Sequence, residues 1–422
     1  MVCNWYTAAS MRRWSLVCLL SVALAFAYTH RTNISFALAD PNFIAFLRLT
    51  DTDRGTLNSA FFWTYGLLQI PAGSLVDRWG AKWPLSVGLF CWCLLSAATG
   101  LANTFWTVLA LRLLLGLFEA VITPAGLRWI RDHMEERRRG LATGIFFAGS
   151  KYGPAVAAPV AAWLIKEHGW RSMFLNQGLY GLLWLAPWIV FASSGRGPRA
   201  KSVEADAALP FFSLFASRVM WGTLVGTFAY NYFVFFAMSW LPAYFVEQRH
   251  LSLSSMGIYT GFSYGGTAAV AILAGLAADW MIERGADPLA TRRGFTIAGL
   301  LVASTVVLGA LSQSTTGAIF FSILSMSGLG LATANYWSLP QTVMPKAMAG
   351  RVGGAQNMAL TAAGIIAPIA TGWLKQISGG YAAPMALIGV LLLIGIGAYV
   401  FLVRQPEAAE TVTFAREQPY IT

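Results

Sequence analysis

The sequence predicts an all-α membrane protein with twelve transmembrane helices in two pseudo-symmetric six-helix bundles. Its 422 residues are 57% hydrophobic and only 11% charged, less than half of the roughly 25% charged residues of soluble globular chains. Apolar runs of about 20 residues, the length that crosses a bilayer, recur along the whole chain. Motifs in the first half of these runs return in the second half.

The apolar runs must be helical, because lipid offers backbone groups no other hydrogen-bond partner. The predicted spans are 14–38, 55–76, 82–102, 106–129, 140–165, 171–192, 214–245, 254–281, 293–312, 316–343, 351–376 and 381–403. A polar segment that contains Gly and Pro divides them six and six, as expected of an interdomain linker. The expected domains are therefore an N-terminal bundle (1–192), a cytoplasmic linker (193–213), a C-terminal bundle (214–404) and a short cytoplasmic tail (405–422).

The basic residues are distributed unevenly between the two ends of the spans. About 20 of the 29 Lys and Arg residues fall at one end, whereas six fall at the other: Arg48, Arg54, Lys166, Arg171, Arg249 and Lys375. This is the positive-inside bias, and it predicts that both termini are cytoplasmic. The net charge of +11 therefore indicates contact with anionic lipids and not nucleic-acid binding.

Two motifs recur six spans apart. "GSLVDRWG" (73–80) ends the second span and "GLAADWMIER" (275–284) ends the eighth, each with Gly-x-x-x-Asp on the predicted cytoplasmic side. A second pair of similar segments is "AAPVAAWL" (157–164) and "IAPIATGWL" (366–374). Parallel repeats of six spans are the layout of transporters whose halves rock around a central site.

These stretches resemble the major facilitator superfamily, because "GSLVDRWGAK" is similar to its loop signature Gly-x-x-x-Asp-Arg-x-Gly-x-Lys/Arg. Within it the chain resembles the anion:cation symporter family of sugar-acid, phthalate, sialic-acid and vesicular glutamate carriers. The resemblance covers the whole chain and rests on "YTHRTNIS", "FFWTYGLLQIPAGSLVDRWG", "LRLLLGLFEAVITPAGLR" and "SWLPAYF". It implies the major facilitator fold and a place in a bacterial inner membrane.

Five titratable residues lie well inside spans, all in the first half: His30, Arg31, Arg112, Glu119 and Lys151. A charge at the bilayer centre costs roughly 2.5–3.5 kcal/mol on insertion scales, so such groups face a partner or an aqueous path. Three are cations and one is an acid, so the interior is net positive and favours an anionic substrate.

Arg31 is the candidate to bind a carboxylate in two hydrogen bonds, although a helix-end arginine can also extend to the interface. Arg112 and Glu119 are two helical turns apart and share one face. We expect Arg112 to bind substrate and Glu119 to carry a proton. The alternative is that both pair with neighbouring helices and only hold the bundle. The resemblance implies the proton role, because Glu119 matches the family's span-four glutamate.

His30 and Lys151 have two open interpretations each. His30 stands where sugar-acid members often carry Asp, and it either relays protons or is a hydrogen-bonded structural residue. Lys151 either binds a second anionic or hydroxyl group of the substrate or pairs with Glu119.

Polar and aromatic residues should contact the body of the substrate. The candidates are Tyr28, Tyr65 and Gln69 in the first half and Asn335, Trp337 and Asn357 in the second. The resemblance implies that Asn357 contacts substrate hydroxyls and that Trp337 corresponds to the family's span-ten tryptophan.

The loop signature predicts gating residues, namely Gly73, Asp77, Arg78 and Asp279. A carboxylate at a helix end can accept hydrogen bonds from the first N–H groups of the next helix. We expect Asp77 to close the cytoplasmic gate in this way, and Asp279 to do the same in the second half.

The resulting hypothesis is a monomeric secondary transporter that takes up an organic anion with protons, for example a hexuronate, aldonate or aldarate. It needs no cofactor or metal ion. The first alternative is an organic-anion exchanger or facilitator on the same fold. Efflux of cationic drugs is less favoured, because the spans hold one acid against three cations. An enzyme is not expected, since the sequence has no nucleophile elbow, HExxH motif or metal cluster.

Overall fold

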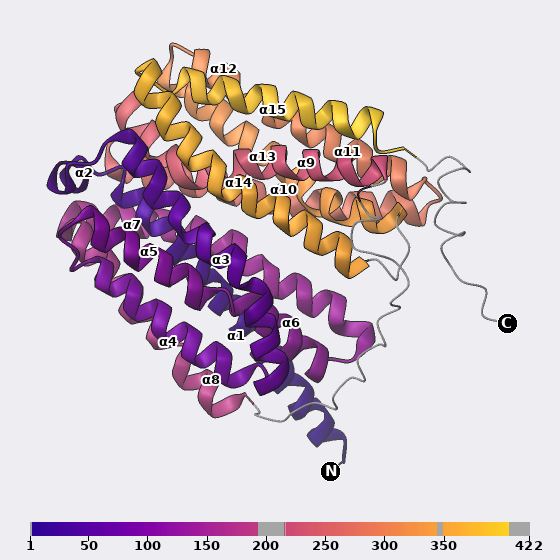
Figure 1. The fold of residues 1–422 in the computed structure, drawn as a ribbon. Coiled ribbons are helices and arrows are strands. Elements are labelled where there is room, and N and C mark those ends of the chain that lie inside the picture. The colour runs from indigo at the N-terminus through magenta and orange to yellow at the C-terminus, as the bar shows by residue number, and fades with distance from the viewer. Residues whose placement is uncertain (1, 193–214, 216, 344–348, 405–422) are drawn as a thin grey trace. The chain divides into compact units, whose positions relative to one another are not determined.

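The computed structural model describes residues 2–192, 215, 217–343 and 349–404, and every regular element in these ranges is helical (Figure 1). Contacts divide the chain into two compact units. The first unit is Met1–Arg199, Met238–Gly265 and Pro368–Gln376, and the second is Ala200–Ala237, Gly266–Ala367 and Ile377–Thr422. The predicted linker 193–213 and tail 405–422 lie outside the described residues.

The helices of the first half are α1 (Val2–Ala37), α2 (Pro41–Leu47), α3 (Asp51–Trp79), α4 (Lys82–Thr99), α5 (Phe105–Glu119), α6 (Ile122–His133), α7 (Glu136–Leu182) and α8 (Leu185–Phe191). Those of the second half are α9 (Arg218–Ala243), the π-helix η2 (Tyr244–Gln248), α10 (Leu253–Glu283), α11 (Pro288–Ala303), α12 (Val306–Leu311), α13 (Thr315–Val343), α14 (Ala349–Ser378) and α15 (Ala382–Phe401).

Nine stretches of the described residues are helices long and apolar enough to cross a membrane. One of them, Arg138–Phe191, is 54 residues long and covers two predicted spans. Its helix α7 breaks at Gly169, where φ is 79°, between the predicted spans 140–165 and 171–192. Helices α3 and α4, which match the second and third predicted spans, are not among the nine. The total of twelve spans therefore stays a prediction.

Local capping explains where α3 and α5 begin. Thr50 caps α3 in a capping box, in which its side chain accepts from the Asp53 N–H and the Asp53 carboxylate accepts from the Thr50 N–H. Thr104 caps α5 by accepting a hydrogen bond from the N–H of Thr107. These caps fix the starts of two helices that supply candidate site residues, among them Tyr65, Arg112 and Glu119.

Small residues let the helices of the first unit approach backbone to backbone. A Cβ at Gly149 of α7 would fall on the carbonyl oxygen of Ser21 in α1, and one at Gly153 would overlap the backbone of Ala25. Similarly, a Cβ at Gly116 of α5 would fall on the carbonyl oxygen of Phe61 in α3. Close packing of this kind is a main source of stability for helices in lipid.

The variant Gly149→Ala should therefore destabilise the protein. Its methyl group has no room against the α1 backbone, and overpacking of this kind costs about 1–3 kcal/mol. Gly144→Ala is the matched control on the same helix, because a Cβ there meets nothing within 4 Å. Thermal unfolding in detergent should show a lower Tm for Gly149→Ala only, and equal Tm values would contradict the prediction.

Glycine residues also allow close backbone packing between the helices of the second unit. A Cβ at Gly299 of α11 would overlap the backbone of Gly328 and Ala332 in α13. Helix α10 joins them through Thr267, whose hydroxyl donates to the Met326 carbonyl at 2.8 Å. Helices α11 and α12 also pack on α15.

Candidate functional site

The first unit encloses an ion pair that links α1 to α5. The Nε of Arg31 donates to the carboxylate of Glu119, the last residue of α5. Arg31 is 7% exposed and Glu119 is fully buried. The sequence indicated both groups separately but did not predict that they pair.

Aromatic rings surround the Arg31 guanidinium. Its central carbon lies 4.4 Å from the ring centroid of Tyr28, 4.5 Å from that of Tyr65 and 5.0 Å from that of Phe61. Cations are attracted to such ring faces, more strongly when water is excluded. Phe61 was missed by the sequence analysis, although it lies one turn before Tyr65 and hence on the same face of α3.

Arg112 contacts the backbone of α1 beside the ion pair. Its Nη1 donates to the His30 carbonyl at 3.0 Å and its Nη2 to the Arg31 carbonyl at 3.1 Å. Arg112 is 3% exposed, and its guanidinium lies 5.6 Å from the Phe61 ring centroid. These contacts tie α5 to the segment of α1 that carries Arg31. They agree with the alternative interpretation from the sequence, in which Arg112 pairs with a neighbouring helix and holds the bundle together.

His30 faces α7, whereas Arg31 faces α3 and α5. The His30 ring is fully buried, and its Nε2 is 3.1 Å from the carbonyl oxygen of Gln177. A Cβ at Gly181, one turn further along α7, would overlap the Cys93 sulfur and lie 3.3 Å from Cε1 of the imidazole. His30 and Arg31 are therefore neighbours in the sequence whose side chains contact different helices.

Lys151 and Gln69 are partly buried, in α7 and α3 respectively. Among the residues that the structure describes, Lys151 forms no ion pair, so the proposed pairing with Glu119 is not present. The carboxylate of Glu119 instead forms an ion pair with Arg31.

The candidates from the second half lie in α13 and α14, in the second unit. Asn335 is buried and donates to the Leu331 carbonyl at 3.2 Å. The ring of Trp337 stacks on Tyr336 with centroids 5.7 Å apart. Asn357 of α14 is partly buried. Near them, the hydroxyl groups of Tyr230 and Thr333 are 2.7 Å apart.

The gating carboxylates pair with arginine side chains, where the sequence analysis expected backbone N–H groups. Asp77, close to the end of α3, is 2.8 Å from Nη1 of Arg128 and 3.7 Å from Arg131, both in α6. Asp279 of α10 is 3.1 Å from Nη2 of Arg292 in α11. A guanidinium is a stronger partner for an exposed carboxylate than a neutral N–H group.

Gly73 and Arg78 complete the predicted gating set on α3. A Cβ at Gly73 would meet nothing within 4 Å, and Arg78 is exposed.

Apolar helices long enough to cross a bilayer, with charged residues buried between them, are typical of integral membrane proteins that move a polar substrate. The family model described as Major Facilitator Superfamily matches residues 20–368. The chain belongs to that superfamily, which confirms the resemblance read from its motifs, and it is a transporter and not an enzyme.

Curated relatives match over almost the whole chain. A Probable L-galactonate transporter of Escherichia coli (strain K12) is 29% identical over 404 residues, which are 92% of this chain and 88% of the relative. A Probable galactarate/D-glucarate transporter of the same strain is 26% identical and covers 93% and 94% of the two chains. A Hexuronate transporter of Bacillus subtilis (strain 168) is 28% identical and covers 92% and 94%.

A solved structure shows the same fold. It is a bacterial homolog of the human lysosomal transporter Spinster, in an inward-facing and occupied conformation. The match has a TM-score of 0.78 at 18% sequence identity and covers 97% of this chain and 98% of that one.

Proposed function

We propose that this protein takes up a small organic anion of the sugar-acid class together with protons, by alternating access. The proposal includes a monomer in a bacterial inner membrane, with twelve spans and both termini in the cytoplasm. Relatives that match more than nine-tenths of the chain are named as transporters of galactonate, galactarate, glucarate and hexuronate. The proposed substrate class is inferred from these names, and the proposed mechanism is inferred from the residues of the first unit.

The single observation that carries the proposal is the buried pair of Arg31 and Glu119. A substrate carboxylate that binds Arg31 must compete with the Glu119 carboxylate for the same guanidinium. A buried carboxylate that loses its counter-charge is costly, and a proton restores its neutrality. Binding of the anion at Arg31 and protonation of Glu119 are thereby coupled.

Return of the empty carrier follows from the same pair. When substrate and proton have left, Glu119 pairs with Arg31 again and neutralises the charge of its guanidinium. The pair can then reorient without exposing either of its two charges alone to the bilayer, which favours return of the empty carrier. This favours symport over obligatory exchange, in which the empty carrier must not return.

The other first-half residues have distinct proposed roles. Arg112 holds the α1 backbone through the His30 and Arg31 carbonyls and so positions the Arg31 side chain. Tyr28 and Tyr65 pack against the guanidinium and restrict its position. The buried contact of His30 with Gln177 favours the structural interpretation of His30, and leaves Glu119 as the proton carrier.

A sugar acid also needs groups that bind its hydroxyls and any second carboxylate. Lys151 is proposed to bind the second carboxylate of an aldarate, since no described acid neutralises it. Gln69, Asn335, Trp337 and Asn357 are proposed to bind the hydroxylated body of the substrate. The gating role of Asp77 and Asp279 is proposed through their arginine partners on α6 and α11.

The test is proton entry into proteoliposomes that contain the purified protein. Galactonate, galactarate, glucarate and a hexuronate are added one at a time, with a cationic drug as control. Acidification of the lumen by one of the acids and not by the drug is the expected result. If no acid moves protons but a preloaded acid exchanges, the protein is an exchanger and the proton coupling is wrong.

A further inference from the structure

The interior of the spans holds one carboxylate, which limits how many protons a transport cycle can move. Glu119 is fully buried, and it is the only acid among the five titratable residues that lie well inside the predicted spans. A proton that travels with the substrate needs a group that is charged in one part of the cycle and neutral in another. The number of protons per cycle therefore depends on whether any other group can change its charge in this way.

The titratable groups that the structure places around the pair of Arg31 and Glu119 come from four helices. They are Arg31 and Tyr28 on α1, Tyr65 on α3, Cys93 on α4 and Arg112 on α5. A phenol and a thiol are uncharged near pH 7, and a guanidinium keeps its proton in proteins. These groups hold or polarise the carboxylate, but they do not carry a proton in its place.

His30 keeps its proton count for a different reason. Its Nε2 lies 3.1 Å from the carbonyl oxygen of Gln177, and because a carbonyl only accepts, Nε2 carries the hydrogen of a neutral ring. The ring is fully buried, and among the described residues no acid forms an ion pair with it. A second proton would place an unpaired cation there, which is costly.

Lys151 contributes a charge that stays constant through the cycle. It is partly exposed, so water can hydrate its ammonium group, and a hydrated ammonium is charged near pH 7. Ala155, one turn later on the same face of α7, has its carbonyl oxygen 3.0 Å from the Cβ position of Gly261 in α10. Gly149 and Gly153 instead pack on α1. Lys151 thus lies on another face of α7 from the one that meets the helix of Arg31.

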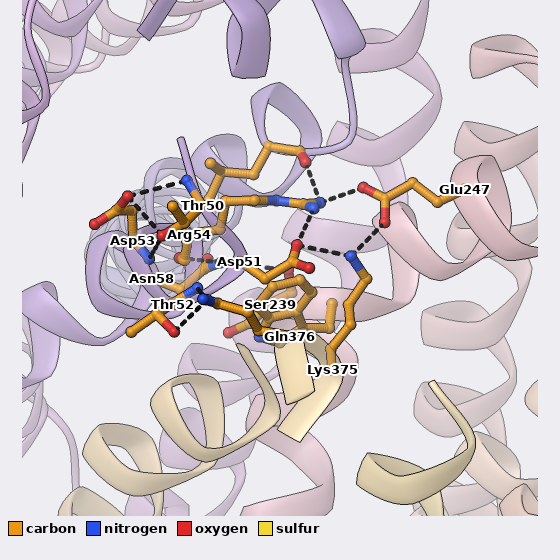
Figure 2. Close-up of polar contacts among 12 residues, drawn as sticks. Thr50, Asp51, Thr52, Asp53, Arg54, Asn58, Ser239, Glu247, Lys375 and Gln376 are labelled. Carbon is orange, nitrogen blue, oxygen red and sulfur yellow. Dashed lines mark hydrogen bonds and ion pairs between the residues drawn. The ribbon is translucent and has the colours of Figure 1, made fainter. Parts of the chain in front are cut away.

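The acids at the helix ends have cations of their own. Figure 2 shows Asp51 and Glu247, each of which contacts both Arg54 and Lys375. Lys375 lies 2.7 Å from the Asp51 carboxylate and 3.0 Å from that of Glu247. The gating carboxylates also have arginine partners. An anion that binds Arg31 displaces none of these acids from its partners, in contrast to Glu119.

Asp40 is a second buried acid, and it has a capping role beyond the end of α1. It is 2% exposed, and its Oδ1 accepts hydrogen bonds from the N–H and from the side-chain amide of Asn42, both at 3.1 Å. Among the described residues it forms no ion pair that a substrate anion could displace. Substrate binding at Arg31 therefore leaves the contacts of Asp40 unchanged.

We propose that one proton, carried by Glu119, accompanies each sugar acid, whatever the charge of that acid. The inference rests on the proposed proton-coupled uptake and adds the number of protons to it. The net charge that crosses the membrane in one cycle is the sum of the charges of the proton and the anion. A monocarboxylate such as galactonate thus crosses without net charge, whereas a dicarboxylate such as galactarate carries one negative charge inward.

The membrane potential then divides the sugar acids into two classes. In a membrane that is negative inside, the potential does not act on the accumulation of a monocarboxylate, but it opposes that of a dicarboxylate. One net charge changes the equilibrium about tenfold for each 59 mV. Aldonates and hexuronates, which carry one carboxylate, are therefore the acids that the protein concentrates most in an energised membrane, and aldarates accumulate less.

The test measures the accumulation ratio, which is the concentration of substrate inside divided by that outside at steady state. Proteoliposomes contain the full-length protein, and radiolabelled galactonate, galactarate and a hexuronate are added one at a time. A potassium gradient with valinomycin sets the membrane potential. Buffers set a pH gradient of one unit, acidic outside, and protein-free liposomes give the background.

At zero potential the ratio should reach about ten for each acid, because one proton is coupled to one pH unit. A potential of about 59 mV, negative inside, should leave the ratio of a monocarboxylate unchanged and lower that of galactarate about tenfold. His30→Gln should give the same values, since His30 carries no proton in the cycle. A tenfold rise with the potential for a monocarboxylate, or no change for galactarate, would mean two protons and overturn the inference.

The outcomes separate this inference from the proposed function. Two protons per cycle would refute the inference and leave proton-coupled uptake in place. No response to the pH gradient from any of the acids would refute both. A loss of the pH response in His30→Gln would assign the proton to His30 instead of Glu119. The native protein alone decides the number of protons, and either class of acid suffices, because one and two protons predict different effects of the potential for each.

Discussion

The variant Glu119→Gln should exchange a preloaded sugar acid but should no longer accumulate it against a gradient. Glutamine keeps the size and a hydrogen-bond acceptor for Arg31 but cannot gain or lose a proton. Without proton coupling, uptake stops when the inside and outside concentrations are equal. Counterflow and net uptake in proteoliposomes with an imposed pH gradient measure the two activities separately.

His30→Gln is the comparison for this experiment. His30 is also fully buried and titratable, but its ring faces Gln177 and not the ion pair. Accumulation should survive in His30→Gln. Loss of accumulation in this variant would instead assign His30 to the proton relay, and loss of exchange in Glu119→Gln would argue against a simple proton role for Glu119.

The second large effect is expected for Arg31→Lys. A lysine keeps the charge but loses the planar guanidinium that can bind a carboxylate in two hydrogen bonds and that packs against Tyr28 and Tyr65. The initial rate of uptake at low substrate concentration should fall about a hundredfold, which corresponds to ~2.7 kcal/mol. The rate is measured with radiolabelled substrate.

Arg171→Lys is the matched control for this substitution. Arg171 also lies over aromatic rings, 4.3 Å from the centroid of Trp170 and 5.0 Å from that of Phe46, but outside the candidate site. Uptake by Arg171→Lys should stay close to the native rate. An equal loss in both variants would show that the effect at Arg31 reflects folding and not substrate binding.

The sequence predicts those features that depend on residues close together in the chain. The helical fold follows from the apolar runs, and the start of α3 could be predicted from Thr50 followed three residues later by Asp53. The helical period also places Arg112 and Glu119 on one face, and both do reach α1.

The partners across helices could not be predicted from one sequence. Arg31 and Glu119 are 88 residues apart, and Asp51 and Lys375 are 324 residues apart. Periodicity tells which residues of one helix share a face, but it does not tell which helix that face meets. The same reason explains why the arginine partners of Asp77 and Asp279 were missed.

The backbone contacts at Gly116 and Gly149 have a consequence for how such a protein can change over evolution. Neither position tolerates even a methyl group, so α1, α3, α5 and α7 form a frame whose helix spacing is fixed. New specificity must then arise by exchange of side chains around Arg31, with the frame conserved. In a laboratory selection for growth on a different acid, we expect substitutions at positions such as Gln69 and Lys151, and none at these two glycines.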